Sequence, residues 1–260
     1  SLLLFLGTFE NGRGLYVLSL LCFVFSIFSK QTAVTLPAII LMMDYLFVSN
    51  YDLKEVLKKR YYHIPFWGLL LFYLLFRYLY FGGIGDIEAS AAWDRYSYSI
   101  IQPYMVLTYI RMLIVPSGLC IDHAVNPLKI CDFRIIFSFL FLAGMFICVY
   151  LVSKEKTHVS KIILFSVLWF FVTLSPTSSI FPTTSVLVEN RLYLSGFGFY
   201  FLIVFLYFLI FQKVPICEEP GNRVIIIVVI AHIALLGILT VKRNYFFQDP
   251  LRMWQDVVRK

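Results

Sequence analysis

The chain alternates long apolar blocks with short polar stretches. An 18-residue helix rises about 27 Å, close to the thickness of the hydrocarbon core of a bilayer. Blocks of this kind therefore predict helices that cross a membrane, some of them short and extended by polar turns at the interface. The predicted spans are residues 15–29, 33–48, 64–81, 135–152, 162–175, 196–211 and 224–241, with residues 1–9 as the tail of an eighth.

The apolar block 97–115 differs from the others, because Gln102, Pro103 and Arg111 interrupt it. Two loops, residues 50–63 and 153–161, are rich in lysine and arginine, and such loops stay on the cytoplasmic side. One predicted span leaves the first loop and one enters the second. A further crossing between them would put one basic loop outside. We therefore predict that residues 97–115 form an amphipathic or re-entrant helix in the outer interface.

This choice fixes the predicted topology. The outer stretches are residues 30–32, 82–133, 176–195 and the tail from 242, and the inner ones are 50–63, 153–161 and 212–223. The predicted fold is all-α: a polytopic, multi-pass transmembrane bundle of about seven spans plus one outer interfacial helix. It occupies residues 1–241, and residues 242–260 form a tail on the non-cytoplasmic side. The outer loops are the longer ones, and long ordered loops usually carry function.

The composition agrees with that of a membrane protein, and we expect membrane lipid as a partner of the chain. Of the 260 residues, 60% are apolar and 14% charged, against about 25% charged in an ordinary soluble domain. The net charge of +7 comes from loops between the apolar blocks, so topology explains it. No basic patch is interleaved with stacking aromatics, and we expect no nucleic-acid partner. The sequence has no phosphate-binding glycine loop, nucleophile elbow or metal-ligand histidine spacing, so no metal site is predicted.

Charged side chains at the ends of spans are the candidate functional residues. Arg191 can bind a phosphate through its planar fork of donors, and Glu189 can orient it or bind a sugar hydroxyl. The alternative is an exposed ion pair of little energetic value. Lys30 is either a lysine whose ammonium reaches the interface or a cation that faces an anionic headgroup.

Acidic residues give weaker indications. Asp122 and His123 follow the interfacial helix, and they either help to hold a sugar acceptor or a divalent metal or are solvated loop residues. Asp44 lies near the inner end of its span, where an aspartate is costly and is normally paired. We favour a structural role for Asp44.

Three segments resemble a known family. Residues 28–45 (FSKQTAVTLPAIILMMDY) are similar to the "SKE-x-A-x-T-L-P … D-Y/W" segment of the transmembrane-and-tetratricopeptide-repeat (TMTC-like) proteins. Residues 176–180 (PTSSI) with 189–194 (ENRLYL) resemble the same family's "P-S-S-N/I … E-R-x-L-Y-L-P" segment. Residues 254–260 (WQDVVRK) resemble its join into the first repeat. This family consists of predicted O-mannosyltransferases of the GT-C superfamily.

The resemblance implies a membrane glycosyltransferase that moves a sugar from a polyprenyl-phosphate donor to protein hydroxyls on the non-cytoplasmic face. It implies that Lys30 and Arg191 contact the donor phosphate. Glu189 and Tyr193, with Asp122 and His123, would shape the site. No cofactor beyond the donor lipid is implied.

The sequence also departs from that family. The family's catalytic acid lies in a "W-D-D"-like motif near the N-terminus. No such motif opens this chain, and the Trp93-Asp94-Arg95 triplet lies elsewhere, so the catalytic residue is unassigned. We expect a fragment of a longer protein whose catalytic front and repeats lie outside these residues. The alternative is a non-catalytic membrane subunit that anchors or braces a larger complex. A transporter is third, since no inverted repeat is visible.

Overall fold

The computed structural model describes residues 1–82, 93–120, 123, 125, 131–178, 182–183, 185–212, 221–249, 251 and 254–255. This part of the chain is helical and contains no strand. Its α-helices are α1 (Leu2–Asn11), α2 (Arg13–Ser29), α3 (Leu36–Met43), α4 (Leu53–Lys58), α5 (Arg60–Phe81), α7 (Arg95–Ile114), α8 (Phe133–Ser153), α9 (His158–Leu174), α10 (Leu192–Gln212) and α11 (Gly221–Phe247). Two 3-10 turns, η1 (Gln31–Thr35) and η3 (Glu189–Arg191), and a π-helical turn, η2 (Asp44–Val48), complete them.

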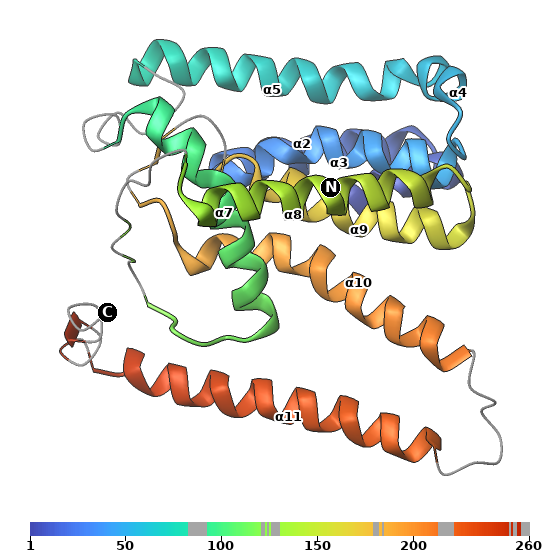
Figure 1. Ribbon diagram of the computed structural model, residues 1–260. Helices are drawn as coiled ribbons and strands as arrows, with labels where there is room; N and C mark the ends of the chain where they lie inside the picture. The colour runs from blue at the N-terminus through green and yellow to red at the C-terminus, as the bar shows by residue number, and fades with distance from the viewer. Residues whose placement is uncertain are drawn as a thin grey trace.

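The long helices run back and forth between two ends of the molecule, and α7 lies across one of them (Figure 1). We call that end, with residues 30, 82, 94, 115–120, 132, 175–178, 182–183 and 185–191, the α7 end. The opposite end, with residues 49–60 and 154–157, is the α4 end. Helix α9 is the central element, since it contacts α3, α8 and α10.

The predicted apolar blocks lie in helices, as does the block 97–115, apart from the last residue of the blocks 162–175 and 97–115. Four helical segments are long and apolar enough to cross a membrane: Gln31–Val48, Arg60–Phe81, Phe133–Ser153 and Glu189–Leu209. Helices α2 and α9 are apolar but have only 17 residues each. The described residues are thus helical as predicted, and four helices among them qualify as candidate membrane spans by length and composition.

The outward faces of these helices are apolar. On α5 the side chains of Leu71 and Leu79 are 70% and 73% exposed, and on α8 Phe139 is 62% exposed. Contiguous apolar surface on this scale is rare in soluble monomers. Lipid solvates such faces well, and these helices therefore suit a membrane.

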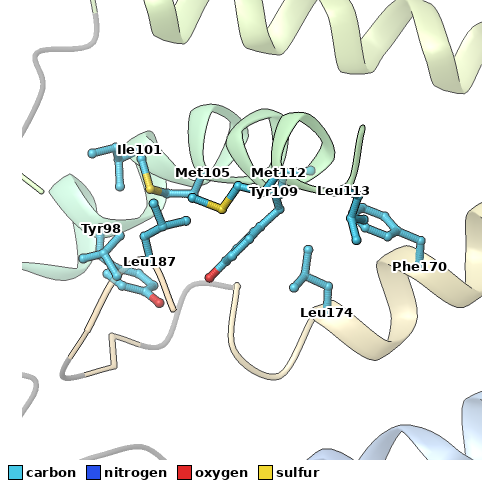
Figure 2. Packing of buried hydrophobic residues seen from close by; sticks show 11 residues of the cluster. Tyr98, Ile101, Met105, Tyr109, Met112, Leu113, Phe170, Leu174 and Leu187 are labelled. Carbon is cyan, nitrogen blue, oxygen red and sulfur yellow. The ribbon is translucent and has the colours of Figure 1, made fainter. Parts of the chain in front are cut away.

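Helix α7 is anchored by one continuous apolar face. Tyr98, Ile101, Met105, Tyr109 and Met112 recur at helical spacing and are all buried. Figure 2 shows them against Leu187 and, from α9, Phe170 and Leu174. This packing explains how a helix with interior Gln, Pro and Arg is held at the α7 end without the hydropathy of a membrane span.

The sequence predicts residues 33–48 as one apolar helix. In the structure they belong to three successive elements: the 3-10 turn η1, the α-helix α3 and the π-helical turn η2. Pro37 lies in the first turn of α3, as its second residue, where its missing N–H costs nothing. At Asp44 the turn widens, because the Ser49 N–H donates to the Asp44 carbonyl at 2.7 Å. Such π turns are often found at functional sites.

Helices α9 and α10 approach each other closely at Gly198. A Cβ at this position would lie 2.5 Å from the Ser166 carbonyl oxygen and 3.0 Å from the Phe170 nitrogen, both backbone atoms. Small residues allow such close approach of helices in membranes. Gly198→Ala should therefore force the helices apart and lower the free energy of unfolding by about 1–3 kcal/mol.

The purified variant is unfolded with increasing concentrations of a denaturing detergent, and circular dichroism monitors the loss of helix. The measured quantity is the detergent concentration at the midpoint of unfolding. Gly144→Ala on α8 is the matched control, since nothing lies within 4 Å of a Cβ there. Equal midpoints for the two variants would show that α9 and α10 are not in close contact.

Candidate functional site

The segment before α10 is organised around Arg191. Its Nη1 donates to the carbonyls of Thr177 (3.3 Å) and Val186 (3.1 Å). Its Nη2 donates to the Ser185 carbonyl (2.7 Å) and the Thr183 hydroxyl (3.0 Å). Both terminal nitrogens of the guanidinium are thus bonded to the chain itself. The arrangement ties the end of α9 to the start of α10.

Two tyrosines of α7 complete this arrangement. Tyr98 donates its hydroxyl to the Thr177 carbonyl at 3.0 Å, and the Tyr109 hydroxyl accepts the Val188 N–H at 3.0 Å. Burial raises the pKa of Tyr109, which keeps its hydroxyl neutral at physiological pH. Figure 2 shows both rings reaching from α7 on either side of Leu187. Helix α7 is therefore the support on which Glu189 and Arg191 are placed.

Glu189 and His123 lie together at the α7 end. Glu189 Oε1 accepts the backbone N–H of Cys120 and lies 3.5 Å from His123 Nε2. That separation is too long for a hydrogen bond in this geometry, and the buried His123 Nε2 has no hydrogen-bond partner. Both side chains are less than a quarter exposed. A fixed carboxylate next to an unpartnered imidazole nitrogen is an arrangement that can accept a proton.

The other predicted site residues lie apart from this pair. Tyr193 is 87% exposed, Lys30 is exposed after α2, and no hydrogen bond joins either of them to Glu189 or Arg191 in the described part of the chain. Asp122 lies outside the described residues. The sequence prediction grouped these residues by their place in loops. Among Lys30, Tyr193, Glu189 and His123, which the structure describes, it brings together Glu189 and His123.

Beside Lys30 there is a polar contact that the sequence did not indicate. With its amide oxygen turned toward Arg77 of α5, Gln31 accepts from both terminal guanidinium nitrogens, at 2.6 and 2.9 Å. Arg77 therefore lies next to the side chain of Gln31, the residue that follows Lys30 in the chain.

An apolar groove of about 790 Å³ runs along α10. It begins at Leu192 and Tyr193, passes Gly196 and Tyr200 and ends at Val204, with Trp169 of α9 on its wall. Trp169 is fixed there by its indole N–H, which donates to the Leu194 carbonyl at 2.9 Å. The groove therefore extends away from the α7 end along a candidate membrane span.

A second polar cluster lies near the α4 end. Asp44 is fully buried and is bonded to Ser49 (2.7 Å), Lys59 (3.2 Å) and His63 (2.7 Å). The Lys59 ammonium also donates to Ser49 at 2.9 Å and lies over the ring of Phe9. The expectation that Asp44 is paired is confirmed.

The partners of Asp44 were missed. Lys59 and His63 follow it by 15 and 19 residues and lie on the next long helix or just before it. The only signal in the sequence was a costly acidic residue one loop away from a run of basic residues. No groups of three or more metal-ligating side chains occur among the described residues.

Comparison with known proteins adds no assignment. No protein-family model matches the chain, and the searches of curated proteins and of solved structures give no match. Function is therefore argued from the two polar clusters and the grooves beside them.

Proposed function

We propose that this chain is the membrane part of a glycosyltransferase that transfers a sugar from a polyprenyl-phosphate donor to protein hydroxyls at the α7 end. The observation that carries the proposal is the Glu189–His123 pair, which sits at one end of an apolar helical bundle. The sequence resemblance to the TMTC-like family supplies the substrate class.

The chemistry needs a base and a place for the leaving group. The acceptor oxygen attacks the anomeric carbon, the bond from that carbon to the phosphate oxygen breaks, and the hydroxyl proton passes to the base. In this proposal His123 Nε2 takes the proton and Glu189 stabilises the imidazolium that forms. In the resembled family the acidic motif near the N-terminus has this role.

Cations at the same end would bind the departing polyprenyl phosphate. Of the two predicted phosphate ligands, Lys30 suits the role better, since its ammonium is exposed whereas both terminal nitrogens of Arg191 are already bonded. Arg191 is then a positioning residue that places Glu189. The groove along α10 has the apolar lining that an isoprenoid tail requires.

The second candidate is a non-catalytic membrane subunit. It is favoured by the same bonds of Arg191 and by the contact of Glu189 with the Cys120 N–H, because both tie loops together without any substrate. The two candidates differ in one measurement. Purified protein in detergent either transfers a radiolabelled sugar from polyprenyl phosphate to a Ser/Thr peptide or does not, and the variants that assign such activity are given in the Discussion.

The proposal includes the full topology: seven crossings, with the α7 end and the C-terminus on the non-cytoplasmic side. In a cysteine-free background, Tyr193→Cys should react with an impermeant maleimide added from the non-cytoplasmic side. Lys58→Cys, at the opposite end, should react only after the membrane is opened. Both original side chains are largely exposed, so access does not limit labelling. The reverse labelling pattern would invert the topology.

A further inference from the structure

A second groove lies at the α4 end, beside the first half of α5. The Glu189–His123 pair lies at the opposite end of the molecule. Its volume is about 420 Å³, and its lining is almost entirely apolar. Helix α5 forms one wall with Ile64, Trp67, Gly68 and Leu71, and Leu41 of α3 stands on the other. Gly68 has nothing within 4 Å of an added Cβ, so it leaves the floor of the groove open.

A cation without a carboxylate partner stands at one end of this groove. Lys58 pairs with Glu55 and Lys59 with Asp44, but Arg60 makes no ion pair with any described residue. Its guanidinium lies 5.2 Å from the ring centroid of Tyr61 and lines the groove. An arginine in this position matches a phosphate in geometry and charge.

His63 provides a second, independent indication of a ligand. It lines the groove, its side chain is only 6% exposed, and Nε2 is held by Asp44 at 2.7 Å. The other ring nitrogen, Nδ1, is buried without a hydrogen-bond partner. A buried nitrogen of this kind usually has a partner. A polar headgroup in the groove would supply it.

We propose that this groove binds one anionic phospholipid of the surrounding membrane, with its phosphate at Arg60 and an acyl chain along Ile64, Trp67 and Leu71. The length fits: 11 residues of helix from Arg60 to Leu71 rise about 16 Å, roughly half of a 30 Å hydrocarbon core. One acyl chain of one leaflet has that reach. The site is independent of sugar transfer, since it lies at the opposite end of α5.

Trp67 makes the proposal testable by fluorescence. The full chain, purified in neutral detergent, is titrated with phosphatidylglycerol brominated on its acyl chains, and separately with brominated phosphatidylcholine. The contribution of Trp67 is the difference in fluorescence quenching between the unmodified protein and Trp67→Phe. We expect half-maximal quenching at about a tenfold lower mole fraction of the anionic lipid, the effect of one charge-assisted contact.

Two variants separate this site from general surface charge. Arg60→Gln should abolish the preference for the anionic lipid, and Lys58→Gln should retain it, although both remove one charge from the same loop. Equal quenching by the two lipids in the unmodified protein would overturn the proposal. An equal loss of the preference for the anionic lipid in both variants would also overturn it. Displacement of the brominated lipid by excess glycerol 3-phosphate would do the same, because it would assign the groove to a soluble phosphate compound. Elution as a single species on gel filtration confirms that each variant is folded.

Discussion

Glu189→Gln should lower the rate of sugar transfer by about two to four orders of magnitude, the usual contribution of a general acid–base group. Glutamine keeps an oxygen that can accept the Cys120 N–H, so the loop should stay in place. It removes the negative charge that would stabilise the His123 imidazolium. The measurement is the initial rate of transfer of labelled sugar from polyprenyl phosphate to a hydroxyl-bearing peptide.

The matched control is Asp132→Asn. Asp132 is also an acidic residue in the loops at the α7 end, where it caps α8 by accepting the Arg134 N–H at 2.9 Å. Asparagine caps a helix equally well, so this variant should keep full activity. His123→Phe should lose as much activity as Glu189→Gln, because the two residues act as one unit. Unchanged transfer in Glu189→Gln would remove this pair from the reaction, and absence of transfer in the unmodified protein would favour the subunit alternative.

Asp44→Ala should destabilise the protein by about 3–5 kcal/mol, the cost of breaking a buried ion pair by removing one partner. The substitution leaves Lys59 and the buried His63 without their acceptor, and the Ser49 hydroxyl loses its bond as well. The π turn at the α4 end should loosen at the same time. The measurement is the free energy of unfolding in mixed detergent micelles.

A second substitution shows whether the uncompensated charge is the cause. Lys59→Met added to Asp44→Ala should recover part of the loss, because it removes the cation that has lost its carboxylate partner. Lys58→Ala, which breaks the exposed pair with Glu55, should leave the unfolding midpoint unchanged. A loss for Asp44→Ala no larger than that of Lys58→Ala would mean that the buried cluster does not hold α3 and α5 together.

The helices could be predicted because their signal is local. A run of 15 or more apolar residues bounded by charges has few alternatives to a helix, and α2, α5 and α8 begin and end within four residues of the predicted limits. Charge in the loops led to the prediction that residues 97–115 lie in the outer interface, and this stays a prediction. The actual support of α7, the buried face from Tyr98 to Met112, is an amphipathic pattern that only the packing against α9 and Leu187 explains.

The sites were only partly predictable, since a hydrogen bond depends on which helices become neighbours. Sequence by itself determined that the chain is helical and apolar, where its polar ends lie, and that Asp44 needs a partner. Tertiary structure alone decided that the partners are Lys59 and His63, that His123 meets Glu189, and that Arg191 is bonded to its own loop. The physical reason is the sequence distance over which each effect operates. The hydropathy of a helix depends on neighbouring residues, whereas the pairing of charges depends on which helices, distant in sequence, pack against each other.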